Sequence, residues 1–276
     1  MKILGDSACD LTTELEKELN AERAVPFNLE IGNDSFVDDE TLSMPVLMEK
    51  MKACTGKMGS SCPSPAQWMT AFVNAGGGFA VTISSKLSGM YQSAKIGLEM
   101  AKSEVKGLVG HVFDSKSASC GEVLVALKIR QYMENGLNFD AVVKKVEQFI
   151  EGMKTFVLLE DISNLVKNGR MSKVKGKIIS VLGIKPVLCS KDGEIDLFGK
   201  FRGSSNVAGK LFECIAMSKR ETKGEDLIIS HCNNRSLAEA LRDMAKEIFD
   251  FSRILILETK GLSSFYACDK GVILSF

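Results

Sequence analysis

Short apolar runs alternate with longer amphipathic segments along the first half of the chain. The runs have the length of buried strands, and the segments between them repeat apolar residues with helical spacing. One such helical face consists of Phe139, Val142, Val143, Val146, Phe149 and Ile150. The expected strands are 3–4, 24–31, 79–83 and 111–113, and the expected helices are 11–19, 45–52, 65–73, 88–102, 120–133 and 139–150. Strands that alternate with helices predict a mainly parallel sheet covered on both faces.

The second half predicts a mixed arrangement of strands and helices. Turn residues at 191–193 predict a β-hairpin, as do those at 33–34 in the first half, and Ser236 is expected to cap a helix. The expected strands are 155–159, 185–189, 194–198, 227–230, 254–258 and 272–276, and the other expected helices are 162–167 and 204–219. We therefore expect an α/β fold with two domains, a mainly parallel three-layer α/β/α domain over residues 1–152 and a mixed α/β domain over residues 153–276.

Length and composition fit this two-domain expectation and exclude several classes of protein. The chain has 276 residues, and one domain usually takes ~100–200 residues. Lys and Arg number 35, and so do Asp and Glu, so the zero net charge argues against a general nucleic-acid or membrane-surface binder. Apolar runs all fall short of the ~20 residues of a membrane span, which predicts no stable membrane insertion.

The eight cysteines bear on the compartment of the protein. None of them forms a CxxC pair, and Asp6 comes too early for the apolar region of a signal peptide. We therefore expect reduced thiols and a cytoplasmic protein.

The most informative segment is ISSKLSGMYQSA, residues 83–94. An apolar run leads into a group of hydroxyls, Ser84, Ser85 and Ser88, and then into Gly89 and a helical pattern. A strand, a turn and a helix in this order place free backbone N–H groups at a helix N-terminus, where the helix dipole also favours negative charge. The segment therefore predicts an anion-binding turn.

A second hydroxyl group lies in GSSCPSP, residues 59–65. Pro63 and Pro65 predict a rigid loop before a helix, from which Ser60 and Ser61 can point toward the turn that carries Ser88. The alternative is a helix N-cap with ordinary turn serines. Ligands of open α/β sheets bind beyond the carboxyl ends of the strands, which is where residues 83–89 are expected.

Six motifs occur in a fixed order along nearly the whole chain. They are GDSACDL (5–11), SSCPSP (60–65), ISSKLSGMYQSA (83–94), DSKSAS (114–119), KNGRMS (167–172) and KPVLCSKDGEIDLFGKFR (185–202). In this set the chain resembles the DegV family of bacterial fatty-acid-binding proteins. That family is similar in function to the acyl-carrying subunit of bacterial fatty acid kinase.

The resemblance implies a non-enzymatic carrier that buries a long-chain fatty acid and presents its carboxylate to a separate kinase, which makes an acyl-phosphate. Ser60 stands where the family has a carboxylate-binding Thr, and Ser88 where it has a carboxylate-binding Ser. Ser61 and the amide of Gly89 are expected to assist. The fatty acid is the only bound group implied, with no other cofactor.

Two arginines in these motifs are candidates for docking a kinase or contacting phosphate. Arg170 lies in KNGRMS and Arg202 ends the long motif. The alternative for the basic run 167–177 is a solvated face.

The chain departs from the family pattern at its C-terminal end. The family motif H-x-G-P-G, whose His approaches the carboxylate, is absent, and Tyr266 or Ala267 falls near that position. Either the Tyr266 hydroxyl substitutes for the His, or fewer donors hold the carboxylate. Gly5 and Cys62 also replace the usual Thr and Gln. Lipid binding is therefore better supported than delivery to a kinase, and a carrier of a different amphiphile stays open.

Burial of an acyl chain supplies the energy that such a carrier needs. Each buried methylene contributes ~0.8 kcal/mol, so about fourteen contribute roughly 11 kcal/mol before ordering costs. An unpaired carboxylate would cost several kcal/mol, so hydroxyls and amides must hold it. Five methionines are either adaptable tunnel walls or core filling: Met48, Met51, Met58, Met69 and Met90.

A rival interpretation starts from GDS at residues 5–7, which resembles the nucleophile block of GDSL esterases. Ser7 would then need a base, but the C-terminal Asp-x-x-His of those enzymes is absent, and His111 and His231 are the only histidines. We expect Asp6 and Asp10 to form turn and cap hydrogen bonds instead. Neither a metal motif nor a nucleotide-binding motif is present.

Overall fold

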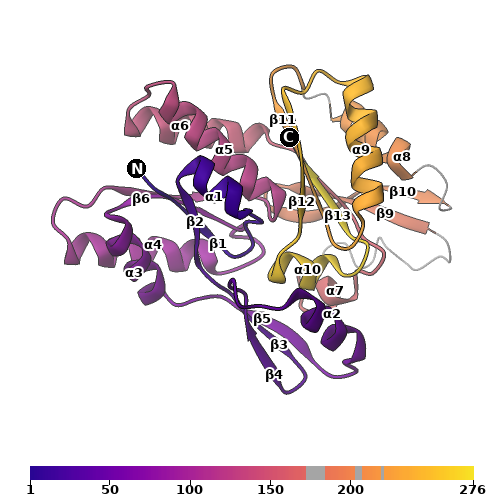
Figure 1. The fold of residues 1–276 in the computed structure, drawn as a ribbon, viewed down its shortest axis with the longest axis horizontal. Helices are drawn as coiled ribbons and strands as arrows, with labels where there is room; N and C mark the ends of the chain where they lie inside the picture. The colour runs from indigo at the N-terminus through magenta and orange to yellow at the C-terminus, as the bar shows by residue number, and fades with distance from the viewer. Residues whose placement is uncertain (172–183, 203–206, 219–220) are drawn as a thin grey trace.

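The computed structural model describes residues 1–171, 184–202, 207–218 and 221–276 (Figure 1). Its first sheet has the strand order β2-β1-β6-β7, and all its strand pairs are parallel. These strands are β1 (Ile3–Asp6), β2 (Ala21–Val25), β6 (Gly78–Thr82) and β7 (Gly110–Asp114). Alternate strand residues point to opposite faces, so Phe79 and Val81 enter one core and Leu4 and Ala80 the other.

Helices cover both faces of this parallel sheet, as the sequence predicted. The first core contains residues of α1 (Thr13–Leu19), α5 (Cys120–Glu134) and α6 (Phe139–Gly152), and the second contains α3 (Pro65–Ala75) and α4 (Met90–Glu104). Every residue from Cys120 to Ile129 is buried, because α5 also packs against the second sheet (Figure 1). Apart from Glu122 and Lys128 these residues are apolar or glycine, which is typical of a helix enclosed in this way.

The second sheet is mixed and has the order β10-β9-β8-β13-β11-β12. Its strands are β8 (Thr155–Leu158), β9 (Ile184–Lys191), β10 (Glu194–Arg202), β11 (Asp226–His231), β12 (Arg253–Glu258) and β13 (Val272–Ser275), with α8 (Val207–Met217) and α9 (Arg235–Ile248) packed against them. Asp192 and Gly193 turn between β9 and β10 with φ of 51° and 82°, which confirms the predicted hairpin. The mixed α/β fold class is therefore confirmed. The boundary at residue 152 stays a prediction.

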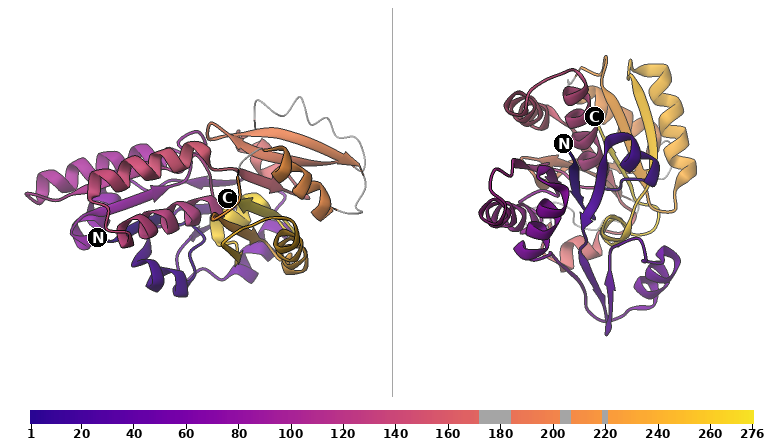
Figure 2. Two further views of the ribbon diagram at one scale, coloured as in Figure 1. Left: turned by 90° about the horizontal axis from the view of Figure 1, so that it is seen from above. Right: turned by 60° about the vertical axis from the view of Figure 1, so that its left-hand side comes forward.

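A small antiparallel sheet, β4-β3-β5, projects with α2 (Met44–Ala53) from one side of the molecule (Figures 1 and 2). Its strands are β3 (Asn28–Ile31), β4 (Asp34–Val37) and β5 (Met58–Ser61). The expected single strand 24–31 is therefore wrong: Pro26 lacks an N–H donor, and β2 and β3 belong to different sheets on either side of it. The loop expected at Ser60 and Ser61 is also wrong, since both residues lie on β5.

Two further corrections concern helices. Ser236 lies inside α9, whose N-cap is Asn234. The short helix α10 (Gly261–Ala267) was not expected, whereas α7 (Ser163–Lys167) was. The expected helix 204–219 corresponds to α8, with residues 204–206 and 219 outside the described part of the chain.

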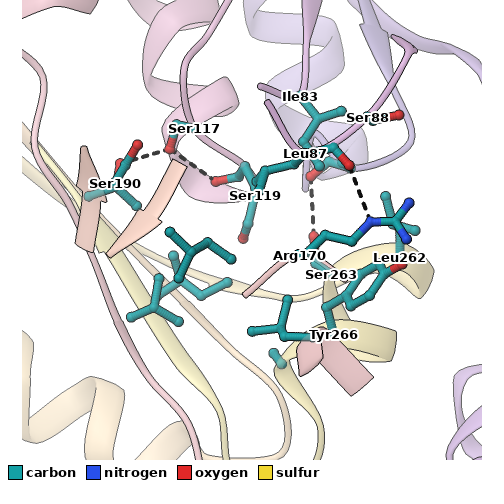
Figure 3. A pocket seen from close by; sticks show the side chains of 18 of the residues that line it. Ile83, Leu87, Ser88, Ser117, Ser119, Arg170, Ser190, Leu262, Ser263 and Tyr266 are labelled. Carbon is teal, nitrogen blue, oxygen red and sulfur yellow. Dashed lines mark hydrogen bonds between the residues drawn. The ribbon is translucent and has the colours of Figure 1, made fainter. Parts of the chain in front are cut away.

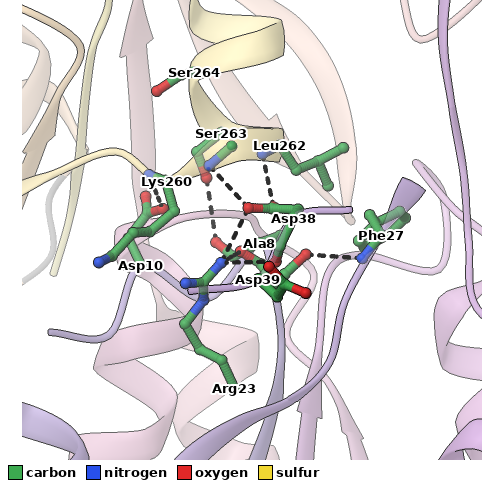
Figure 4. Close-up of polar contacts among 12 residues, drawn as sticks. Ala8, Asp10, Arg23, Phe27, Asp38, Asp39, Lys260, Leu262, Ser263 and Ser264 are labelled. Atoms are coloured by element: carbon green, nitrogen blue, oxygen red, sulfur yellow. Dashed lines mark hydrogen bonds and ion pairs between the residues drawn. The ribbon is translucent and has the colours of Figure 1, made fainter. Parts of the chain in front are cut away.

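Helix α10 comes from the C-terminal end but is fixed to the N-terminal half (Figure 4). Both carboxylate oxygens of Asp38 accept amide protons, from Gly261 at 3.0 Å and Leu262 at 2.8 Å. Asp10 accepts from the Lys260 amide at 2.7 Å. Two buried carboxyls thus satisfy amides that the first turn of a helix leaves unpaired, and they set the position of every side chain on α10.

The contact between α3 and α4 allows a test of the fold. A Cβ added to Gly97 would lie 2.5 Å from the Trp68 Cβ and 2.6 Å from the Pro65 carbonyl oxygen. We expect Gly97→Ala to force the helices apart and to destabilise the protein by about 2–3 kcal/mol, which thermal unfolding would show as a Tm lower by roughly 5 °C or more. Gly56→Ala is the control, because its nearest neighbour would be 3.9 Å away. An equal Tm for the two variants would contradict the close packing.

Candidate ligand-binding site

A cavity of about 420 Å³ lies where the three sheets and α10 meet (Figure 3). This volume is in the usual range of small-molecule sites, ~300–1,000 Å³. Ile83 directly follows β6, Ala118 lies in the loop after β7, Val157 comes from β8 and Leu262 from α10. The remaining apolar lining consists of Ala8, Phe27, Leu87, Leu159, Leu165, Ile195, Ala267 and Ile273. The body of the cavity therefore suits an apolar guest.

Hydroxyl groups gather at one end of this cavity. Ser60 on β5 and Tyr266 on α10 form a hydrogen bond of 2.9 Å between their hydroxyl oxygens. Register with β3 places Ser60 opposite Leu29, and the capping of α10 places Tyr266. Ser61, which follows Ser60, also lines the cavity. The structure thus brings together Ser60 and the residue expected near the position of the family His.

The turn before α4 contributes the second predicted serine. The Ser88 hydroxyl accepts the Met90 amide at 3.2 Å, so its own proton stays available for a ligand. Gly89 is the N-cap of α4 and lines the cavity beside Ser88. The earlier hydroxyls of the turn do not join them: buried Ser84 donates to the Gly193 carbonyl at 2.7 Å, and Ser85 is absent from the lining. Ser60, Ser61, Ser88 and Gly89 therefore all line one cavity.

Arg170 supplies positive charge at this end. Its Nε donates to the Leu87 carbonyl at 3.3 Å and its Nη1 to the Asn168 carbonyl at 2.5 Å. Its Cζ lies 5.9 Å from the centre of the Tyr266 ring, within the range of cation–π attraction. The guanidinium is held at the cavity by these contacts (Figure 3). The side chain of the other candidate, Arg202, lies outside the part of the chain that the structure describes.

The opposite end carries hydroxyls to which the sequence analysis gave no role. Ser117 and Thr155 are 2.7 Å apart, Thr155 and Ser275 are 2.9 Å apart, and Ser190 donates to the Lys116 carbonyl at 2.5 Å. Ser117 lies in the motif DSKSAS, but its partners come from distant strands. These hydroxyls bond to one another and to the backbone, so the far end presents few unmet polar groups.

Of the two interpretations of the methionines, core filling is confirmed and tunnel walls are wrong: Met51 and Met90 belong to the second core, and Met48, Met58 and Met69 pack against it. None of the methionines in the described part of the chain lines this cavity. Met90 is buried and lies 3.1 Å from the Trp68 Nε1, whereas Met48, Met51 and Met58 line a separate surface groove. The cavity wall is built from smaller and branched aliphatic side chains instead.

The esterase residues occupy structural positions. Ser7 is buried, accepts the Phe27 amide at 3.0 Å and does not line the cavity. Asp6 accepts the amides of Ala8 at 2.8 Å and Ile83 at 2.9 Å. Asp10 accepts the amide of Lys260. These contacts confirm the turn and cap hydrogen bonds expected of Asp6 and Asp10. No group of His, Cys, Asp and Glu in the described residues is arranged to hold a metal ion.

Buried carboxyls accept hydrogen bonds from residues that line the cavity. Burial raises the pKa of Asp6 to about 7 and that of Asp10 to about 6, and it raises the pKa of Glu122 well above its usual value. Asp6 holds the Ile83 amide, and Asp10 accepts the Ser119 hydroxyl. Ile83 and Ser119 both line the cavity, so its geometry depends on this acidic cluster.

Comparisons with known proteins agree over the full length. The sequence matches the family described as "Uncharacterised protein, DegV family" over residues 1–272. A DegV domain-containing protein from Streptococcus gordonii is 35% identical over 100% of this chain and 98% of that protein. A DegV family structure from Ruminococcus gnavus ATCC 29149, refined with vaccenic acid, has a TM-score of 0.94 at 34% identity, covering 100% of this chain and 99% of the other.

A second solved structure is similar over the same extent. It is the fatty acid kinase (Fak) B3 protein of Streptococcus pneumoniae loaded with linoleic acid, with a TM-score of 0.89 and 30% identity over 100% of this chain and 98% of that chain. In the described residues, no helix combines the length and the apolar character needed to span a membrane. Sequence motifs, fold and full-length similarity lead to one conclusion: the chain belongs to the DegV family.

Proposed function

We propose that this protein binds one long-chain fatty acid. Its carboxylate would lie at the end of the cavity formed by Ser60, Ser88, Arg170 and Tyr266, and its acyl chain would fill the apolar body. The observation that carries the proposal is the Ser60–Tyr266 hydroxyl pair, 2.9 Å apart, at one end of an otherwise apolar cavity. The neighbours from R. gnavus and S. pneumoniae hold vaccenic and linoleic acids, which supports this ligand class.

The polar end has the donors that a carboxylate needs. When a carboxylate replaces the mutual hydrogen bond of Ser60 and Tyr266, the hydroxyls of Ser60, Ser61, Ser88 and Tyr266 can each donate one hydrogen bond to it. Hydrogen bonds to a charged oxygen are about twice as strong as neutral ones. The Gly89 amide belongs to the helix N-terminus, where the dipole favours an anion. Tyr266 thus takes over the contact that the resemblance assigned to a His, as a donor without positive charge.

We propose that the protein presents this carboxylate to a separate kinase and is not itself an enzyme. One neighbour bears the name of a fatty acid kinase subunit, and the carboxylate end carries Arg170. Arg170 and Arg202 remain our candidates for contacting the kinase or its phosphate. The proposal requires no cofactor besides the fatty acid.

Mass spectrometry of an organic extract from the purified protein tests the ligand class. We expect close to one straight-chain fatty acid per protein chain, without added lipid. Buffer that is carried through the same purification without protein is the control for contaminating lipid. An extract that contains a different amphiphile, or none, would contradict the proposal. Ester turnover that Ser7→Ala abolishes would favour the esterase instead.

A further inference from the structure

A row of three buried hydroxyls reaches the far end of the apolar cavity, opposite Tyr266 (Figure 3). Between hydroxyl oxygens, Ser275 lies 2.9 Å from Thr155, and Thr155 lies 2.7 Å from Ser117. Ser117 and Thr155 line the cavity, whereas Ser275 does not. The three residues are no more than 4% exposed. Polar groups at this depth need hydrogen-bond partners, so the use of each proton can be followed.

The row has one proton more than its internal hydrogen bonds use. Three hydroxyls carry three protons, and the two bonds between them use two. The Cys120 thiol donates to Ser275 at 3.4 Å, so Ser275 directs its own proton to Thr155, which in turn donates to the next hydroxyl. The reverse direction would leave the proton of fully buried Ser275 without an oxygen acceptor among the described residues.

The spare proton therefore belongs to Ser117, at the cavity surface. In the part of the chain that the structure describes, its one acceptor is the Ala118 carbonyl at 3.5 Å, a distance at which a hydrogen bond is weak. An acceptor is present nearby as well. The Ser190 hydroxyl donates to the Lys116 carbonyl at 2.5 Å, so its oxygen keeps lone pairs for a ligand, and it lines the same end of the cavity (Figure 3).

A glycine on α5 makes room for this row. A Cβ added to Gly121 would overlap the Ser117 hydroxyl, and it would lie 2.6 Å from the Ser117 Cβ and 3.2 Å from the Ser275 Oγ. Glycine near the start of a helix gives up the stability that alanine would provide. The hydroxyls are therefore fixed by the packing of α5 against the strands, and the donor of Ser117 is held in place.

We propose that this end of the cavity is a subsite for a hydroxyl group on the distal part of the bound acyl chain, with Ser117 as its donor and Ser190 as its acceptor. The inference rests on the proposed function, because the carboxylate of the same ligand occupies the opposite end. A ligand hydroxyl both accepts and donates, so it satisfies both serines. A plain methyl end leaves the Ser117 proton unmatched. The preferred ligand is then a long-chain hydroxy fatty acid.

Displacement of a fluorescent fatty acid from the full chain tests this preference. The competing ligands are hexadecanoic acid and a series of hexadecanoic acids that carry one hydroxyl at successive positions in the distal half. We expect one position to bind about fivefold more tightly than hexadecanoic acid, which corresponds to the net gain from about one hydrogen bond. At a wholly apolar end every added hydroxyl would weaken binding, because it would lose its hydrogen bonds to water.

Ser117→Ala should remove the preference. The variant lacks the donor, so we expect the preferred hydroxy acid to bind about tenfold more weakly than to the wild type, with less than a twofold change for hexadecanoic acid. Ser190→Ala should also weaken the hydroxy acid selectively, because it removes the acceptor. Ser103→Ala is the matched control, since Ser103 donates to the Glu99 carbonyl on α4 and does not line the cavity.

Three outcomes separate the proposal from its alternatives. Weaker binding of every hydroxy acid than of hexadecanoic acid to the wild type would overturn the proposal, and this result needs no variant. An equal loss of both kinds of acid in Ser117→Ala would make Ser117 a structural member of the row and would also overturn it. Failure of the wild type to bind any of these acids would instead contradict the proposed function.

Discussion

Replacing Ser60 and Ser88 together by alanine is expected to empty the cavity of fatty acid. Each hydroxyl donates one hydrogen bond to the carboxylate in the proposed complex, and a hydrogen bond to a charged group contributes about 1.5–3 kcal/mol. Loss of both should lower the affinity by about a hundredfold or more. The acyl chain would keep its apolar contacts, but its charged end would be buried with too few donors. Displacement of a fluorescent fatty acid measures the affinity, and lipid extraction measures occupancy.

Ser85→Ala is the matched control for this double variant. Ser85 is an exposed serine on the same turn as Ser88, yet it does not line the cavity. Its replacement should leave both affinity and occupancy at the wild-type level. Wild-type retention by the double variant would place the carboxylate elsewhere and remove our assignment of both serines.

The stability of the protein is expected to fall by about 2–4 kcal/mol between pH 5 and pH 8, because of its buried acidic cluster. Glu122 is fully buried, and among the described residues neither of its carboxyl oxygens has a hydrogen-bond donor. The Asp6 carboxyl lies close enough to share a proton with it, and burial raises the pKa of Asp6 to about 7. Two carboxyls in such contact favour holding a proton between them.

Stability falls with rising pH because the folded state binds more protons than the unfolded state. In the unfolded chain the Asp6 carboxyl titrates near its ordinary pKa of 3.8, so above that pH the folded protein holds more protons than the unfolded chain. Stability from this cluster is therefore complete below about pH 4 and is lost as the pH rises through about 7. The free energy of unfolding in urea, measured at both pH values, gives the size of the loss.

Glu122→Gln should reduce this pH dependence by at least half. The amide keeps the shape of the side chain, carries no charge, and can donate to the Asp6 carboxylate. The variant should therefore be more stable than the wild type at pH 8 and close to it at pH 5. Glu104→Gln, at an exposed position, should retain the wild-type profile. A profile in Glu122→Gln as steep as that of the wild type would assign the pH dependence to other groups.

Local pattern was sufficient to predict the parallel sheet and its helices. Helix α6 has apolar residues on one face only, and the run 79–83 is short and follows three glycines, so each signal was unambiguous. The errors occur where long-range contacts decide the structure. β5, with the sequence MGSS, lacks strong strand formers and becomes a strand through its pairing with β3. Helix α10 is seven residues long and is capped by Asp10 and Asp38, more than 200 positions away.

The candidate site was predictable to the same extent. The hydroxyls around Ser88 were visible because they follow a strand-like run at a helix start, and those around Ser60 because they precede two prolines at a helix start. The structure brings both groups to one cavity. The Tyr266 contact could be raised only as one of two alternatives, since the sequence alone cannot place α10. Thr155 gave no signal, because a single threonine in a strand is ordinary until its neighbours are known.

The anchoring of α10 also has a consequence for biosynthesis. Tyr266 closes the polar end of the cavity, and it reaches that position only when Asp38 and Asp10 have bound the amides of residues 260–262. The ribosome must therefore have made the chain beyond residue 267 before a closed binding site can form. Shorter nascent chains leave the apolar interior open, so the proposed complex with a fatty acid requires synthesis of the chain through residue 267.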